Sequence, residues 1–270
     1  MYGAIIGDIA GSTYERRNIK TKNFELFRLG SRCTDDTIMS VAVADAVRLH
    51  SSIEDFSQLV IEKMREWGNK YPNAGYGGTF KTWLKDRTMG AYGSYGNGSA
   101  MRVTACALGA STLTEVLELA KLSAEVTHNH PEGIKGAQAI AACVYLANTG
   151  KDKGGIREYV NDNFYMLDSS IDEIRPRYKF DVSCMGSVPV AIQAFLEGDS
   201  FEDVIKTAIS VGGDSDTIAS MAGTIAWSYY KYQNGGNLTA DMGSLKNQAE
   251  KIMPEDIKIS VELFSQSLQM

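Results

Sequence analysis

The sequence predicts an all-α fold, a compact multi-helix bundle that forms one domain over residues 1–270. Apolar residues recur at helical spacing in long runs, whereas the alternating apolar and polar runs that are typical of strands are nearly absent. Clusters of glycine separate the helical runs, and no linker of disordered composition divides the chain. With 44% hydrophobic residues, a chain of this length can bury a sizeable core.

Eight helices are expected along the chain. They cover residues 34–50, 55–68, 99–110, 115–126, 133–148, 187–197, 201–211 and 216–231. Capping boxes indicate three helix starts, because Ser52, Thr112 and Ser200 each precede an acidic residue by three positions. Pro189 suits the first turn of its predicted helix. We expect the segment 150–183 to be the most irregular part, with at most a short extended piece at 178–182.

The composition of the chain indicates which kinds of partner and which cellular compartment to expect. The formal net charge of −6 argues against nucleic acid as the main partner, because a phosphate-binding surface is normally basic. The N-terminus is unlike a signal peptide, and no apolar run reaches the roughly 18 residues of a membrane span. The four cysteines are widely spaced, as is typical of a reducing compartment. We therefore expect a cytoplasmic monomer without a membrane or nucleic-acid partner.

Two acidic motifs at predicted helix starts carry the main functional signal. They are Thr34-Asp35-Asp36-Thr37 and Gly213-Asp214-Ser215-Asp216-Thr217. Each could serve only as a helix cap, with its charge favoured by the helix dipole. If the fold brings the motifs together, four carboxylates converge, and divalent metal is then needed to offset their repulsion. Gly212 and Gly213 indicate a close backbone approach that a cap does not need.

Three further segments could contribute to a site. Glu15 follows a glycine-containing acidic segment and is a candidate general base. The loop 93–102 is rich in glycine and small hydroxyls and runs into a helix, which is typical of an anion site. That loop matches neither the Walker A nor the Rossmann pattern. His128 stands near a predicted helix end, where capping and packing are commoner roles than metal binding.

Taken together and in this order, the motifs resemble those of the ADP-ribosylglycohydrolase family, which includes dinitrogenase-reductase-activating glycohydrolase. The matching segments are Gly7-Asp8-x-x-Gly11-Ser12-x-x-Glu15, Thr34-Asp35-Asp36-Thr37, Gly96-Asn97-Gly98-Ser99-Ala100-Met101-Arg102, Thr127-His128 and Gly212-Gly213-Asp214-Ser215-Asp216-Thr217. They extend over most of the chain. Each motif alone is modest, but five in order at domain-scale spacing are specific.

The resemblance implies an all-α hydrolase that releases ADP-ribose from an arginine or serine side chain, or from a small conjugate such as O-acetyl-ADP-ribose. It implies two divalent ions, Mg²⁺ or Mn²⁺, bound by Thr34, Asp35, Asp36, Asp214, Asp216 and Thr217. Glu15 and Asp36 would then handle protons. The residues expected to bind the ADP-ribose are Ser94, Gly96, Asn97, Gly98, Ser99 and His128.

Two other functions stay open at this point. One is a relative that binds ADP-ribose without turning it over. The other is a metal-dependent phosphohydrolase acting on a nucleotide or a sugar phosphate, since carboxylate-bound metals also suit phosphoryl transfer. The cleft rim, expected at 16–33, 73–79 and 178–187, contains no residue that discriminates among leaving groups.

Overall fold

The computed structural model describes residues 1–269, and almost all regular structure in them is helical. The helices are α1 (Tyr2–Gly11), α2 (Asp35–Leu49), α3 (Ile53–Lys70), α4 (Gly78–Lys85), α5 (Gly98–Met101), α6 (Thr104–Gly109), α7 (Leu113–Glu125), α8 (Pro131–Asn148), α9 (Lys153–Asn163), α10 (Ile171–Ile174), α11 (Cys184–Glu197), α12 (Phe201–Ser210), α13 (Ser215–Gln233), α14 (Ala240–Glu250) and α15 (Glu255–Ser267). In residues 1–269 no strand forms, and one isolated bridge joins Gly96 to Ser183. The all-α prediction is confirmed.

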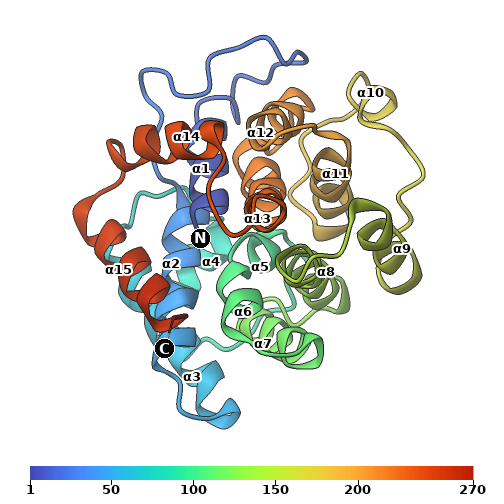
Figure 1. Ribbon diagram of the computed structural model, residues 1–270. Coiled ribbons are helices and arrows are strands. Elements are labelled where there is room, and N and C mark those ends of the chain that lie inside the picture. Colours follow the sequence, from blue (N-terminus) through green and yellow to red (C-terminus); the bar gives the residue numbers. More distant parts are fainter. Residues whose placement is uncertain (270) are drawn as a thin grey trace.

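Helix α13 lies at the centre of the molecule, with α1, α8, α11 and α12 packed around it (Figure 1). Every residue from Ser215 to Ala226 is buried, so this part of the helix is surrounded by protein. Helix α1 is likewise buried from Gly3 to Gly11, and it packs against both α13 and α2. Asp8, Asp36 and Asp216 on these three helices therefore lie in the interior of the protein.

A row of glycines lets α1 lie directly against α13. The row consists of Gly3, Gly7 and Gly11, which share one helix face because they are four residues apart. A Cβ at Gly7 would stand 2.2 Å from the carbonyl oxygen of Ala219, and a Cβ at Gly11 would stand 2.4 Å from Cα of Asp216. No larger residue fits between the two backbones. This close packing places Asp8 on α1 beside the first turn of α13.

The predicted helix starts agree with the structure where capping residues indicated them. Ser52 and the N3 residue Asp55 form a capping box at α3. The hydroxyls of Thr112 and Ser200 accept hydrogen bonds from the third residues of α7 and α12. Helix α11, by contrast, begins three residues before its predicted start, capped by Ser183. Pro189 therefore lies beyond the first turn, and that prediction is wrong.

The predicted helix 99–110 is also wrong, because it is two short helices, α5 and α6. The chain turns at Arg102 and Val103 between them, and Arg102 has a non-helical backbone conformation. The Arg102 side chain is buried beneath this turn, where it donates a hydrogen bond of 2.7 Å to the carbonyl of Gly98. The sequence analysis did not predict six of the helices: α1, α4, α9, α10, α14 and α15.

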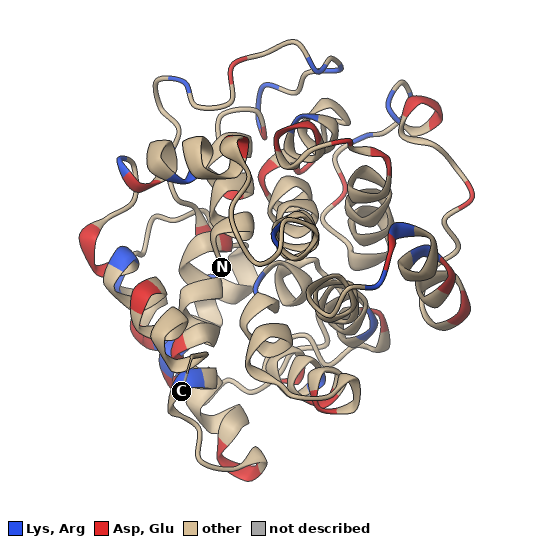
Figure 2. Cartoon of the chain, in the orientation of Figure 1, with Lys and Arg blue, Asp and Glu red and all other residues tan. Residues whose placement is uncertain are grey.

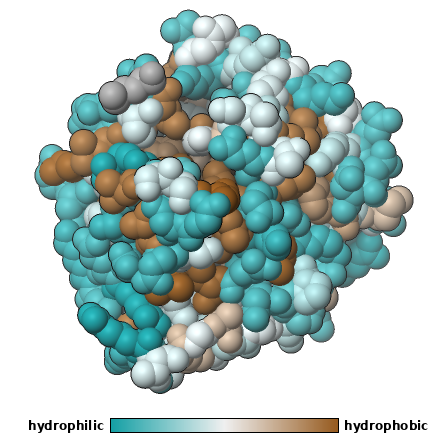
Figure 3. Space-filling model, turned by 90° about the horizontal axis from the view of Figure 1, so that it is seen from below, coloured by the Kyte–Doolittle hydropathy of each residue, from teal (hydrophilic) through white to brown (hydrophobic). Residues whose placement is uncertain are grey.

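Charged residues lie mostly on the outside of the molecule (Figure 2). Hydrophobic residues also reach the surface, and they form an irregular area in the middle of the face seen in Figure 3. The long loop between α1 and α2 is basic, with six lysine or arginine residues and one acid over residues 16–33. None of the helices in the described part of the chain has the length and apolarity needed to cross a bilayer.

Candidate metal centre

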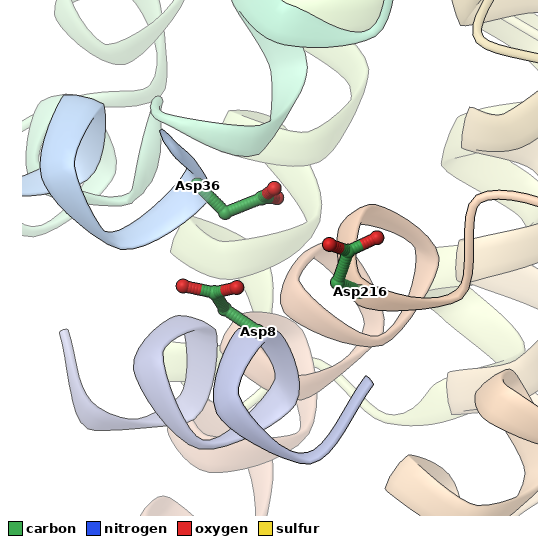
Figure 4. Close-up of side chains that lie close together, drawn as sticks. All are labelled: Asp8, Asp36 and Asp216. Carbon is green, nitrogen blue, oxygen red and sulfur yellow. The ribbon is translucent and has the colours of Figure 1, made fainter. Parts of the chain in front are cut away.

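Three buried carboxylates from three helices point toward one another (Figure 4). Asp8 lies near the end of α1, and Asp36 and Asp216 lie in the first turns of α2 and α13. One oxygen of each carboxylate lies within 4.8 Å of the other two. The fold thus brings the two acidic motifs together, which is the condition on which the metal hypothesis depended.

Asp8 holds the start of α2 in place. Its carboxylate oxygens accept hydrogen bonds from the backbone N–H and hydroxyl of Thr34, at 2.8 and 2.6 Å. They also accept from the backbone N–H of Thr37 at 3.1 Å and from its hydroxyl. These bonds satisfy N–H groups that the first turn of a helix leaves free. The sequence analysis did not include Asp8 among the site residues, although an acid inside the apolar stretch 4–10 was a usable signal.

The carboxylate of Asp36 is not used to cap α2. Its Oδ2 accepts a hydrogen bond of 3.1 Å from the hydroxyl of Thr217 on α13. Its Oδ1 is buried and has no hydrogen-bond partner among residues 1–269. Buried polar atoms are almost always satisfied, so this oxygen indicates a missing partner such as a cation. The acids of this motif therefore do more than a cap requires.

Asp214 connects the metal centre to the loop before α5. It occupies the N-cap position of α13 but makes no capping hydrogen bond, and its Oδ2 accepts from the side-chain amide of Asn97 at 2.7 Å. The preceding Gly213 has φ of +72°, a left-handed conformation that favours glycine. Its backbone is held by Asn18 in two hydrogen bonds of 2.8 and 2.9 Å. The left-handed conformation accounts for the glycine at this position.

Asp35 points away from the cap toward the loop before α4. A Cβ at Gly75, where φ is +125°, would stand 2.8 Å from its Oδ1, so only glycine leaves room there. Burial, reinforced by the charge of Asp8, raises the pKa of Asp35 to about 7. This carboxyl group therefore changes its protonation near neutral pH when no cation is bound.

Burial and mutual repulsion raise the pKa values of the other carboxyl groups as well. For Asp36 and Asp216 burial is the main cause, and the neighbouring carboxylates add to it. Burial also raises the pKa values of Asp8 and Asp214, although hydrogen bonds to the charged forms oppose this effect. A divalent cation would offset both causes, because it supplies the positive charge that the centre lacks.

A cleft of about 350 Å³ opens over this centre. The predicted site residues that line it are Glu15, Thr34, Asp35, Asp36, Ser94, Gly96, Asn97, Gly98, His128, Asp214, Asp216 and Thr217. Ser99 does not line the cleft, because its hydroxyl is buried and donates a hydrogen bond of 2.7 Å to the carbonyl of Gly133. Phe180, from the predicted rim segment 178–187, also lines the cleft, and Tyr92 and Phe80 add aromatic walls that were not predicted from the sequence.

Comparison with known proteins agrees with this geometry. The model of the family described as ADP-ribosylglycohydrolase matches residues 1–234. The ADP-ribosylhydrolase ARH3 of Homo sapiens is 28% identical over 304 residues, which cover 84% of this chain and 83% of that protein. The ADP-ribosylarginine hydrolase Tri1 of Pseudomonas putida is also 28% identical, over 85% of this chain and 69% of its own length. A solved structure titled ADP-ribosylglycohydrolase-related protein complex shares the fold, with a TM-score of 0.65, 20% identity, and coverage of 98% of this chain and 95% of that one.

Proposed function

Because this chain belongs to the ADP-ribosylglycohydrolase family, we propose that it is a metal-dependent hydrolase that releases ADP-ribose. The acceptor would be an arginine or serine side chain of a modified protein, or a small conjugate such as O-acetyl-ADP-ribose. One observation supports metal dependence above all. The Oδ1 of Asp36 is buried without a hydrogen-bond partner among residues 1–269, and it belongs to the cluster formed with the carboxylates of Asp8 and Asp216. All four cysteines are free thiols, which supports a reducing, cytoplasmic setting.

The proposed centre holds two divalent ions, Mg²⁺ or Mn²⁺. The ligands would be Thr34, Asp35, Asp36, Asp214, Asp216 and Thr217, because carboxylate and hydroxyl oxygens suit these hard cations. Bound ions would neutralise the carboxylates and hold the vicinal hydroxyls of the distal ribose. Asp8 supports this set by positioning the first turn of α2, since its own oxygens already accept hydrogen bonds from Thr34 and Thr37.

The chain's own residues would then orient the sugar and move protons. Cleavage at the anomeric carbon develops positive charge, which nearby carboxylates stabilise. The bond from the anomeric carbon to the leaving group would break, the leaving group would take up a proton, and the water that adds to the carbon would give one up. Glu15 and Asp36, which both line the cleft, are our candidates for these proton transfers. The part of the loop that lines the cleft, residues 94–98, would hold the diphosphate together with His128.

The proposal is tested by incubating the protein with arginine-, serine- and acetyl-linked ADP-ribose in the presence of Mg²⁺ or Mn²⁺. Mass spectrometry of the products should show free ADP-ribose from at least one substrate. Asp36→Asn and Asp216→Asn should lose this activity while circular dichroism stays unchanged. Asp162→Asn is the matched control, because Asp162 is exposed and far from the cleft in sequence. Full activity in excess EDTA would refute metal dependence.

The same assay separates the two alternative functions. Release of phosphate from nucleotides or sugar phosphates would identify a phosphohydrolase. Tight binding of ADP-ribose by calorimetry, without turnover of any of the three linkages, would identify a non-catalytic relative. Neither outcome is expected, because Glu15 and the complete set of candidate ligands line one cleft.

A further inference from the structure

Arg102, Thr127 and His128 form a buried chain of hydrogen bonds behind the loop 94–98. The Arg102 guanidinium donates a hydrogen bond of 3.0 Å to the hydroxyl oxygen of Thr127. That hydroxyl lies 2.7 Å from Nδ1 of His128. All three residues are buried, with exposed fractions of 1%, 0% and 5%, so water does not compete for these bonds.

The direction of each bond follows from the chemistry of the groups. Arginine has five N–H donors and no acceptor, so the Thr127 oxygen must accept from Arg102. The one proton of the hydroxyl is then free to be donated, and Nδ1 of His128 is the partner within reach in residues 1–269. The hydroxyl oxygen has two lone pairs and could also accept from an Nδ1–H, but its own proton would then have no partner, so the arrangement with Nδ1 as acceptor is favoured. In a neutral imidazole the other nitrogen, Nε2, must then carry the hydrogen.

His128 is held in its neutral form. Burial lowers its pKa well below the usual range, and the nearby charge of Arg102 lowers it further. Arg102 itself remains a cation at neutral pH, although burial lowers its pKa to about 10. A protonated imidazole would place a second positive charge beside the first. The single N–H of the ring is thus the one at Nε2.

Two glycines leave space in front of Nε2. A Cβ at Gly98 would stand 3.1 Å from this nitrogen, and a Cβ at Gly96 would stand 3.6 Å from it. His128 lines the cleft together with these glycines, and no described residue accepts a hydrogen bond from Nε2. Any side chain at position 98 would crowd the donor. The absence of side chains here keeps a neutral donor accessible from the cleft.

We propose that Arg102 and Thr127 are positioning residues that fix His128 as its Nε2–H tautomer, which donates a hydrogen bond to an anionic oxygen of the ligand. The choice of ligand, the diphosphate of ADP-ribose, rests on the proposed function. The fixing of the tautomer does not. A neutral donor suits a diphosphate because it binds the oxygen at any pH at which the imidazole stays uncharged.

The tautomer is measured first and needs no ligand. Protein labelled with ¹⁵N-histidine is studied by long-range ¹H–¹⁵N correlation, and the His50→Gln and His130→Gln variants identify the signals of His128. The expected spectrum shows a protonated Nε2 and an unprotonated Nδ1. Thr127→Val keeps the side-chain shape but removes the hydroxyl, so both tautomers should appear. Thr127→Ser should restore the wild-type spectrum.

Binding is measured second, by calorimetry with ADP-ribose in the presence of Mg²⁺. Thr127→Val should weaken binding about tenfold, the value of one hydrogen bond to a charged group. Thr127→Ser should bind nearly as tightly as the wild type. Urea unfolding of each variant separates this loss from a general loss of stability.

The outcomes distinguish the two proposals. A protonated Nδ1 in the wild type, or an unchanged spectrum in Thr127→Val, would overturn the hydrogen-bond chain even if ADP-ribose binds. A changed tautomer with unchanged ADP-ribose affinity would overturn the donor role. Absence of any ADP-ribose binding to the wild type would refute the proposed function and with it the assignment of the ligand, while the spectrum would still decide the tautomer.

Discussion

Replacing Gly7 with alanine perturbs the packing of α1 on α13 without changing any charged or polar group. The added Cβ would stand 2.2 Å from the carbonyl oxygen of Ala219, whereas real Cβ contacts essentially never fall below 3.0 Å. The two backbones must therefore separate by about 0.8 Å at this point. Because Asp8 is the next residue on α1, and Asp216 lies one turn from Ala219, the separation acts directly on the metal centre.

Two effects of this substitution are expected. Overpacking costs about 1–3 kcal/mol, and the better helix propensity of alanine offsets up to about 1 kcal/mol of that. A displacement of about 1 Å at a catalytic centre can lower the rate about 100-fold. We therefore expect a modest loss in the free energy of unfolding together with a large loss of ADP-ribose release. Binding of Mn²⁺, measured by calorimetry, should weaken in parallel.

The matched control is Gly243→Ala in α14, where a Cβ would meet nothing within 4 Å. This variant should gain up to about 1 kcal/mol in unfolding free energy and keep full activity. Urea unfolding and the ADP-ribose release assay are run on both variants. Wild-type activity and Mn²⁺ affinity in Gly7→Ala would refute the argument that the glycine row sets the geometry of the centre.

Three further predictions follow from the site and its supports. In EDTA, the free energy of unfolding should fall as pH rises from about 4 to 7. The acids of the centre ionise near pH 4 in the unfolded chain but at higher pH in the folded protein. Between these values the folded state binds more protons, so it loses stability as the pH rises. Mg²⁺ should raise the melting temperature more at pH 7.5 than at pH 5, and a pH-independent melting temperature in EDTA would contradict this reasoning. Asp45→Ala should cost about 2–4 kcal/mol in urea unfolding, because the buried N–H of Trp67 and hydroxyl of Ser260 lose their acceptor, at 2.8 and 2.9 Å. Gly98→Ala should weaken ADP-ribose binding about tenfold by crowding His128, and unchanged affinity in calorimetry would show that the space is not used.

Local sequence signals predicted much of the fold and most of the residues that meet in the cleft. Capping residues such as Ser52 fix where a helix begins, because they act on N–H groups within three positions. The acidic motifs at 34–37 and 213–217 were recognisable for the same reason, since both lie at helix starts. These features depend on neighbours in the sequence, so one chain is enough to identify them.

Features that depend on tertiary contacts were not predictable in the same way. Helix α1 was not predicted from the sequence, and its row of glycines is explained by the close packing against α13. Asn97 was expected to contact the ligand, but its side-chain amide is bound to Asp214, which is distant in sequence. The interruption between α5 and α6 at Arg102 depends on the buried hydrogen-bond acceptors of this side chain, Ser123 and Thr127, which no local sequence pattern reveals.

The packing of α1 on α13 also has a consequence for the order in which the protein assembles during synthesis. Helix α1 leaves the ribosome long before its partner, which begins only at Ser215. At 5–20 residues per second, α1 waits on the order of ten seconds or more for that partner. The metal centre is therefore completed late, and a cation bound there stabilises only a nearly finished fold.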